Sequence, residues 1–267
     1  MKKFKAVAVD MDGTFLNDQK GFDRNLFAEL LKQMKDQGIH FIVASGNQYE
    51  RLRLDFVDHY QDLAFVAENG AYLINEGQDV LAQAFSADLV QRLVAFQKTI
   101  PDIHAVYCGV KHAYMDQNDS PDFLKSMGYY CPNHKLVDGF DQLPADQFIK
   151  ISIDMPAEKT EEIANQYRDE FGDELHVTSS GFGNIDIMIN GVNKAQGLTE
   201  MLAQWNLTGE DLVAFGDGGN DIEMLKFAKY GYAMENASPE VKEITTLRAP
   251  SNNDSGVLRV LEELLNA

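Results

Sequence analysis

The fold expected for this chain is decided by the stretch AVAVDMDGT at residues 6–14. Its four apolar residues predict a short buried β-strand, and Asp10 and Asp12 follow at the carboxyl end of that strand. On an extended backbone, side chains two residues apart leave the same face, so the two carboxylates would project together. Carboxylates this close repel each other unless a cation lies between them or one of them holds a proton. The pair therefore indicates either a divalent-cation site or an acidic turn that caps the strand.

Length and composition restrict the class of protein. The chain has 267 residues, which suits one large or two medium domains. It carries 23 basic and 42 acidic residues, and this net charge of −19 repels nucleic acid and anionic membranes. The apolar run after the basic start is too short for a signal peptide, and no later stretch is long enough to span a bilayer. With only Cys108 and Cys131 and no Cys-x-x-Cys pair, we expect a reduced cytoplasmic protein without nucleic-acid or membrane partners.

Strand and helix patterns alternate over the first 67 residues. A helix is expected from Asp23 to Gly38, a buried strand over 39–44, a second helix through 49–56 and a strand over 64–67. This alternation is typical of a parallel sheet covered by helices on both faces. Asn69-Gly70 then predicts a hairpin turn, and that turn alone can explain the residues Glu68-Asn69-Gly70.

From about residue 83 the pattern changes to helices near 87–99 and 157–171 and strands near 105–108, 148–153, 175–178 and 185–189. The alternating pattern returns with a helix at Lys194, a strand over 212–215, a helix from Ile222 and a strand over 230–234. We therefore expect an α/β fold. Its Rossmann-like parallel-sheet core would comprise residues 1–82 and 188–267, with an α+β unit of residues 83–187 inserted between them.

Polar residues gather at four places where a strand is expected to end or a helix to begin. These are Asp10 to Thr14, Ser45-Gly46, Lys194, and the loop from Gly216 to Asp221. In an open parallel sheet, ligands bind where strands end and helices begin. The coincidence of all four indicates one ligand site better than any of them does alone.

Each of these places also has an ordinary structural explanation. Ser45 could hold an anion such as phosphate with its hydroxyl and nearby backbone N–H groups, or it could simply cap the next helix. Lys194 opposes the dipole of the helix that it begins, which an anionic ligand would relieve, although many lysines are merely exposed. Asp217 could be a carboxylate ligand of a hard cation or part of a solvated acidic turn. A dinucleotide loop is excluded, because Asp221 replaces its last glycine and Asp217 would face the pyrophosphate.

Taken together, the stretches Asp10-Met-Asp-Gly-Thr14, Ser45, Asn193-Lys194-Ala-Gln-Gly197 and Gly216-Asp-Gly-Gly-Asn-Asp221 resemble the four motifs of the haloacid dehalogenase superfamily. Their order and spacing match that family throughout. The insertion between the second and third motifs resembles the class IIB cap of Cof-type phosphatases, including sugar phosphatases. The match of this cap rests on its position and size more than on its sequence.

The resemblance implies a role for each matching residue. Asp10 would be the nucleophile that becomes an aspartyl phosphate, and Asp12 would protonate the leaving alcohol and then activate water. Mg²⁺ would be held by the Asp10 carboxylate, the Asp12 backbone carbonyl and Asp217. The phosphoryl oxygens would be bound by Ser45, Gly46, Lys194 and Asn220, and Asp221 would support the loop.

Asn47 departs from the family pattern, because many relatives carry arginine at its position. The Ser-Gly-Asn form occurs in some sugar phosphatases of this type, and it points modestly to sugar phosphates. The resemblance thus predicts a Mg²⁺-dependent phosphatase of small phosphate monoesters. A phosphosugar mutase of the same fold, or a metabolite-binding regulator without catalysis, remains an alternative. Within the cap, residues 179–183, which include Phe182, and His112 or Tyr114 are expected to face the leaving group.

Overall fold

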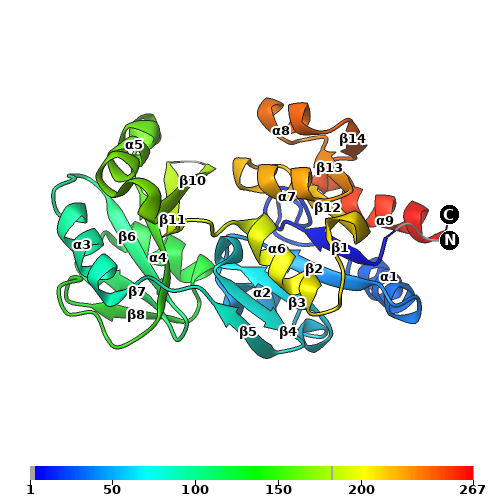
Figure 1. The fold of residues 1–267 in the computed structure, drawn as a ribbon, viewed down its shortest axis with the longest axis horizontal. Coiled ribbons are helices and arrows are strands. Elements are labelled where there is room, and N and C mark those ends of the chain that lie inside the picture. The colour runs from blue at the N-terminus through cyan, green and yellow to red at the C-terminus, as the bar shows by residue number, and fades with distance from the viewer. Residues whose placement is uncertain (1–3, 182, 267) are drawn as a thin grey trace.

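The computed structural model describes residues 4–181 and 183–266, which form two sheets side by side, each with its own helices (Figure 1). The larger sheet has the strand order β14-β13-β12-β1-β2-β3-β4-β5. Its strands are β1 (Ala6–Val9), β2 (His40–Ala44), β3 (Ala64–Ala67), β4 (Tyr72–Asn75), β5 (Gln78–Ala82), β12 (Leu212–Gly216), β13 (Tyr230–Met234) and β14 (Leu247–Ala249). All neighbours from β14 to β3 pair in parallel, whereas β4 and β5 continue the sheet in antiparallel pairs. We call this part the core.

Each of the core helices buries apolar residues. They are α1 (Arg24–Asp36), α2 (Tyr49–Asp55), α6 (Lys194–Ala203), α7 (Ile222–Phe227), α8 (Pro239–Ile244) and α9 (Gly256–Asn266). The α1 helix begins at Asp23, whose carboxylate accepts from the Leu26 N–H, and it buries Phe27, Leu30, Leu31 and Met34. It packs beside α9, while α6 packs on α7, β3 and β4.

The second sheet, which we call the cap, has the order β10-β11-β9-β6-β7-β8. Its strands are β6 (His104–Gly109), β7 (Ala113–Asp116), β8 (His134–Val137), β9 (Phe148–Asp154), β10 (Leu175–Gly181) and β11 (Asn184–Ile189). Helices α3 (Ala87–Gln97) and α5 (Thr160–Phe171) share a buried cluster with one face of the sheet. Helix α4 (Pro121–Tyr130) packs on part of the other face, where Cys108 and Cys131 are both buried and free.

The predicted α/β fold with a Rossmann-like parallel core and an inserted α+β unit is confirmed. The predicted limits of that unit, residues 83–187, stay a prediction, and β11 continues to Ile189 beyond them. The sequence patterns did not reveal β5, β7, β8, β14, α4 or α8. Among the described residues, no helix is both long and apolar enough to cross a membrane.

Candidate active site

The strand order brings three of the predicted stretches together at one edge of the core. Strand β1 is hydrogen-bonded to β12 on one side and to β2 on the other. Asp10 follows β1, Ser45 follows β2 and Asp217 follows β12, so these residues leave the carboxyl ends of three adjacent parallel strands. This is the place where open parallel sheets bind ligands.

Lys194 is completely buried between two of the predicted carboxylates. Its Nζ lies 2.6 Å from Asp10 Oδ1 and 2.6 Å from Asp221 Oδ1. Burial opposes the charge of the ammonium, but attraction to Asp10 and Asp221 outweighs it and raises the Lys194 pKa. The alternative that Lys194 is merely exposed is therefore wrong. The anions that relieve its conflict with the helix dipole belong to the protein itself.

Asp10 lies in a strongly electrostatic environment. Burial and the repulsion of Asp221 raise its pKa well above the usual value, although Lys194 acts in the opposite direction. The Asp10 side chain therefore combines two properties that matter for chemistry. It is shielded from water, and a fixed cation holds one of its oxygens.

Asp217 is oriented by contacts from two loops. Thr14 Oγ1 donates to Asp217 Oδ1 at 2.6 Å, and the backbone N–H groups of Asp217 and Gly218 donate to Asp221 Oδ2 at 2.9 and 3.0 Å. Gly13 passes so close that a Cβ there would lie 2.4 Å from Asp217 Oδ2, and its φ of +80° favours glycine. Burial and the repulsion of Asp221 raise the pKa of Asp217 to about 6.

These carboxylates fit a divalent cation. One carboxylate oxygen from each of Asp10, Asp217 and Asp221 lies within 4.8 Å of the others. Asp221 already accepts from Lys194 and from two backbone N–H groups, which leaves Asp10 and Asp217 as the better ligands. Burial, together with the repulsion of Asp221, raises the pKa values of both residues, and a hard cation bound to the two carboxylates would favour their charged forms.

Asp12 has different neighbours from Asp10. Its Oδ1 lies 2.5 Å from Lys20 Nζ, and its Oδ2 accepts from Asn47 Nδ2 at 2.7 Å. Its carboxylate is not part of the acidic group around Asp217 within the described ranges. Although residue 47 is an asparagine here and not the arginine of many relatives, Lys20 from the loop after β1 places a cation on the same Asp12 carboxylate that Asn47 contacts.

The turn of residues 45–47 is held from several sides. The Asn47 N–H donates to Ser45 Oγ at 3.2 Å, and the Asn69 N–H donates to the Ser45 carbonyl at 3.0 Å. The capping residue of α2 is Gln48 and not Ser45, so helix capping does not explain this serine. The Gly46 carbonyl accepts from Lys150 Nζ at 2.5 Å.

Four buried residues that the sequence interpretation missed surround this turn and Asn220. Glu68 and Asn69 do form the expected turn between the antiparallel strands β3 and β4, but both residues are only 1% exposed. Glu68 pairs with Lys150 at 2.6 Å, and Asn69 donates to Asp186 at 2.7 Å and accepts from Asn220 at 3.0 Å. The available signal was a lysine and an aspartate that alternate with apolar residues in cap strands β9 and β11.

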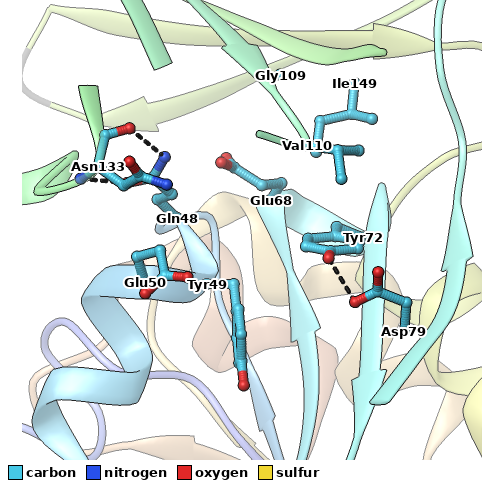
Figure 2. Close-up of a pocket in the computed structure, with 10 residues that line it drawn as sticks. All are labelled: Gln48, Tyr49, Glu50, Glu68, Tyr72, Asp79, Gly109, Val110, Asn133 and Ile149. Carbon is cyan, nitrogen blue, oxygen red and sulfur yellow. Dashed lines mark hydrogen bonds between the residues drawn. The ribbon is translucent and has the colours of Figure 1, made fainter. Parts of the chain in front are cut away.

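A cavity of about 170 Å³ lies between core and cap, and Glu68 is one of the residues that line it (Figure 2). The other lining residues come from α2 and its start, from β4 and β5, and from the cap: Gln48, Tyr49, Glu50, Tyr72, Asp79, Gly109, Val110, Asn133 and Ile149. Gln48 bridges the two parts through hydrogen bonds with the Asn133 backbone. None of the motif residues lines this cavity.

One of the cap residues expected to face the leaving group does not do so. Tyr114 is buried in the cap cluster and donates to Asp146 at 2.9 Å, so it is not free to face a leaving group. Phe182 lies outside the described residues. Cap strand β10 approaches the short helical turn of residues 219–221 in the core.

Comparisons with known proteins agree with this geometry. A family model described as haloacid dehalogenase-like hydrolase matches residues 7–261. The chain is 41% identical to the 5-amino-6-(5-phospho-D-ribitylamino)uracil phosphatase YbjI of Escherichia coli, over 98% of this chain and 96% of that protein. It is 26% identical to the Bacillus subtilis phosphatase YitU of the same description, over 96% of each chain.

Solved structures are similar over the whole length. SMU.1108c from Streptococcus mutans superimposes with a TM-score of 0.95 at 39% identity, covering 99% of this chain and all of that one. The HAD subclass IIB sugar phosphatase BT4131 superimposes with a TM-score of 0.82, covering 97% and 98% of the two chains. At 19% identity it supports the fold alone.

Proposed function

The chain belongs to the haloacid dehalogenase-like hydrolases, as a Cof-type phosphoric monoester phosphatase, and from this premise we propose that it is Mg²⁺-dependent and acts through an aspartyl phosphate on Asp10. One observation carries the proposal. The Asp10 carboxylate is buried, held by Lys194 at 2.6 Å and grouped with Asp217 at the end of the central strand. An anionic nucleophile can approach an anionic phosphate only where fixed positive charge offsets the repulsion.

Asp10 would form the new bond to phosphorus while the bond to the leaving alcohol oxygen breaks. Asp12 would give its proton to that oxygen, and would later take a proton from the water that hydrolyses the aspartyl phosphate. Lys20 and Asn47 hold the Asp12 carboxylate from two sides, which favours one orientation for both proton transfers. Asp10 and Asp12 would thus have separate tasks.

Ser45, the Gly46 backbone, Lys194 and Asn220 would bind the phosphoryl oxygens. Asp10, Asp217 and the Asp12 carbonyl would hold Mg²⁺, which supplies charge neutralisation when bound. Asp221 would keep its supporting role, since its oxygens accept from Lys194 and from the Asp217 loop.

The substrate would be a small phosphate monoester with a polyol part. Sugar phosphates fit this description, and so does the phosphorylated ribityl chain in the substrate that the name of the Escherichia coli relative gives. The cap would close over the leaving group. A panel of sugar phosphates, polyol phosphates and the ribitylaminouracil phosphate, assayed for free phosphate, would rank these candidates.

The nucleophile is tested with 4-nitrophenyl phosphate. We expect turnover with Mg²⁺, loss of turnover with EDTA, and a loss of at least about a thousandfold in Asp10→Asn. Undiminished turnover in that variant would refute the assignment of Asp10. Isomerisation of a hexose phosphate without free phosphate would instead support a mutase.

A further inference from the structure

We propose that Lys150 and Asp186, two buried residues of the cap, position the phosphate-binding groups of the core. The inference rests on the proposed function, because it concerns Gly46, Ser45 and Asn220 in their proposed roles. It adds that the cap contributes to the phosphate site itself, and does not only close over the leaving group.

Lys150 reaches from cap strand β9 into the core. Its side chain is 6% exposed, and its Nζ lies 2.5 Å from the Gly46 carbonyl, 2.6 Å from Glu68 and 3.7 Å from Asp186. A buried ammonium requires partners that satisfy its charge and its donors. Because these partners come from the core as well as the cap, Lys150 ties the two sheets together at a fixed point.

The bond to Gly46 acts on the proposed phosphate loop. The Gly46 carbonyl shares a planar peptide unit with the Asn47 N–H, and that N–H donates to Ser45 Oγ. Lys150 therefore fixes the plane that orients the Ser45 hydroxyl. The Asn47 side chain, which donates to Asp12, leaves the same turn.

Asp186 supports the other side of the site. Its Oδ1 accepts from Ser152 at 2.5 Å and its Oδ2 accepts from Asn69 Nδ2 at 2.7 Å. This bond determines the orientation of the Asn69 amide, so that Asn69 Oδ1 faces Asn220 Nδ2 at 3.0 Å. A cap carboxylate thereby sets the position of a proposed phosphate ligand through one intermediate residue.

The two chains of contacts converge on the turn after β3. Glu68 pairs with Lys150, and its neighbour Asn69 donates to Asp186. Glu68 lines the cavity between core and cap together with Val110 and Ile149 of the cap (Figure 2). A displacement of the cap would break buried charged contacts on both sides of the site at once. The cap position and the geometry of the phosphate site are therefore coupled.

The decisive variants remove the two contacts separately. Lys150→Met combined with Glu68→Gln removes the buried pair. Asp186→Leu removes the acceptor of the Asn69 amide with a side chain of similar shape, and Lys150 then keeps Glu68 as its partner. Tyr107→Phe is the matched control, because it deletes a partly buried hydrogen bond within the cap, to Gln97, that reaches no core residue. Melting temperature and circular dichroism establish that each variant is folded.

We expect kcat for 4-nitrophenyl phosphate to fall about tenfold or more in the Lys150/Glu68 double variant and in Asp186→Leu, and the inhibition constant of inorganic phosphate to rise by a similar factor. Tyr107→Phe should stay within about twofold of wild type. If the two residues had a merely structural role, their substitution would lower the melting temperature without weakening the binding of phosphate.

Folded variants that keep wild-type phosphate affinity and kcat would overturn the proposal. If the double variant does not fold, Asp186→Leu decides by the same two measurements. If wild type hydrolyses no phosphate ester, the proposed function fails, while calorimetric titration of inorganic phosphate with Mg²⁺ still tests the positioning of the site.

Discussion

Asp217→Asn should stabilise the metal-free protein at neutral pH. In the folded chain Asp217 is partly buried and close to Asp221, and these surroundings raise its pKa to about 6 from the usual 3.8. In the unfolded chain both causes disappear. The folded state therefore binds the proton more tightly than the unfolded state does, and ionisation of Asp217 opposes folding.

The sign and size of the effect follow from this difference. Well below pH 3.8 the carboxyl is protonated in both states and does not change the free energy of unfolding. As the pH rises from about 4 to about 6, the unfolded state gains charge first, so stability falls, by about 3 kcal/mol for a shift of roughly two pKa units. Asparagine removes this loss, and its side-chain oxygen can still accept from Thr14.

The measurement is the free energy of unfolding in urea, with EDTA, at several values from pH 4 to pH 7. The difference in unfolding free energy between wild type and Asp217→Asn isolates the contribution of residue 217 from that of other groups that titrate in the same range. The unfolding free energies of the two proteins should agree near pH 4 and differ by up to about 3 kcal/mol at pH 7, where wild type is the less stable. Added Mg²⁺ should reverse the order. Asp36→Asn, at a 67% exposed side chain, should match wild type throughout. If the unfolding free energies of wild type and Asp217→Asn changed equally with pH, the electrostatic argument would be refuted.

Three further changes test the same site. Thr14→Val removes the donor to Asp217 and should raise the Mg²⁺ concentration for half-maximal activity about tenfold, measured by metal titration of turnover. Gly13→Ala should abolish that activation because its Cβ would lie 2.4 Å from Asp217, whereas Gly77→Ala, with φ of +75° and no atom within 4 Å, should cost only about 1 kcal/mol of stability in urea. Lys194→Met leaves two buried carboxylates without their cation and should cost about 3–5 kcal/mol, with turnover lost. Unchanged metal dependence in Thr14→Val would contradict the first prediction, and equal behaviour of the two glycine variants would contradict the second. Wild-type stability of Lys194→Met would contradict the third.

The sequence is most informative where the apolar periodicity agrees with residues that typically begin or end a helix or strand. Helix α1 has a capping aspartate, a regular apolar stripe and a terminal glycine, so its bounds were predicted closely. Strand β8 carries three exposed residues and lacks any apolar run, so nothing local distinguishes it from a loop. Helix α4 did offer a signal in Ser120 followed by Pro121, because serine caps helices and proline favours their first position.

The part of the site that could not be predicted depends on contacts between the two sheets. Lys150 and Asp186 alternate with apolar residues, and this period alone places them on the face away from the cap cluster. Nothing in a single sequence indicates that the core covers that face. Glu68 and Asn69 were assigned to the hairpin because local turn chemistry explained them, and the further partners of their side chains lie far away in sequence.

The motif residues, in contrast, are brought together by sheet topology and not by local chemistry. Asp10 and Asp217 are separated by more than two hundred residues, yet β1 and β12 are neighbours, and β2 with Ser45 lies on the other side of β1. Because a parallel sheet aligns its carboxyl ends at one edge, any structure between the second and third motifs can be enlarged without moving these ends apart. The cap occupies this position. The sheet topology only permits this insertion. Through the contacts of Lys150 and Asp186, however, the geometry of the proposed phosphate site comes to depend on the cap.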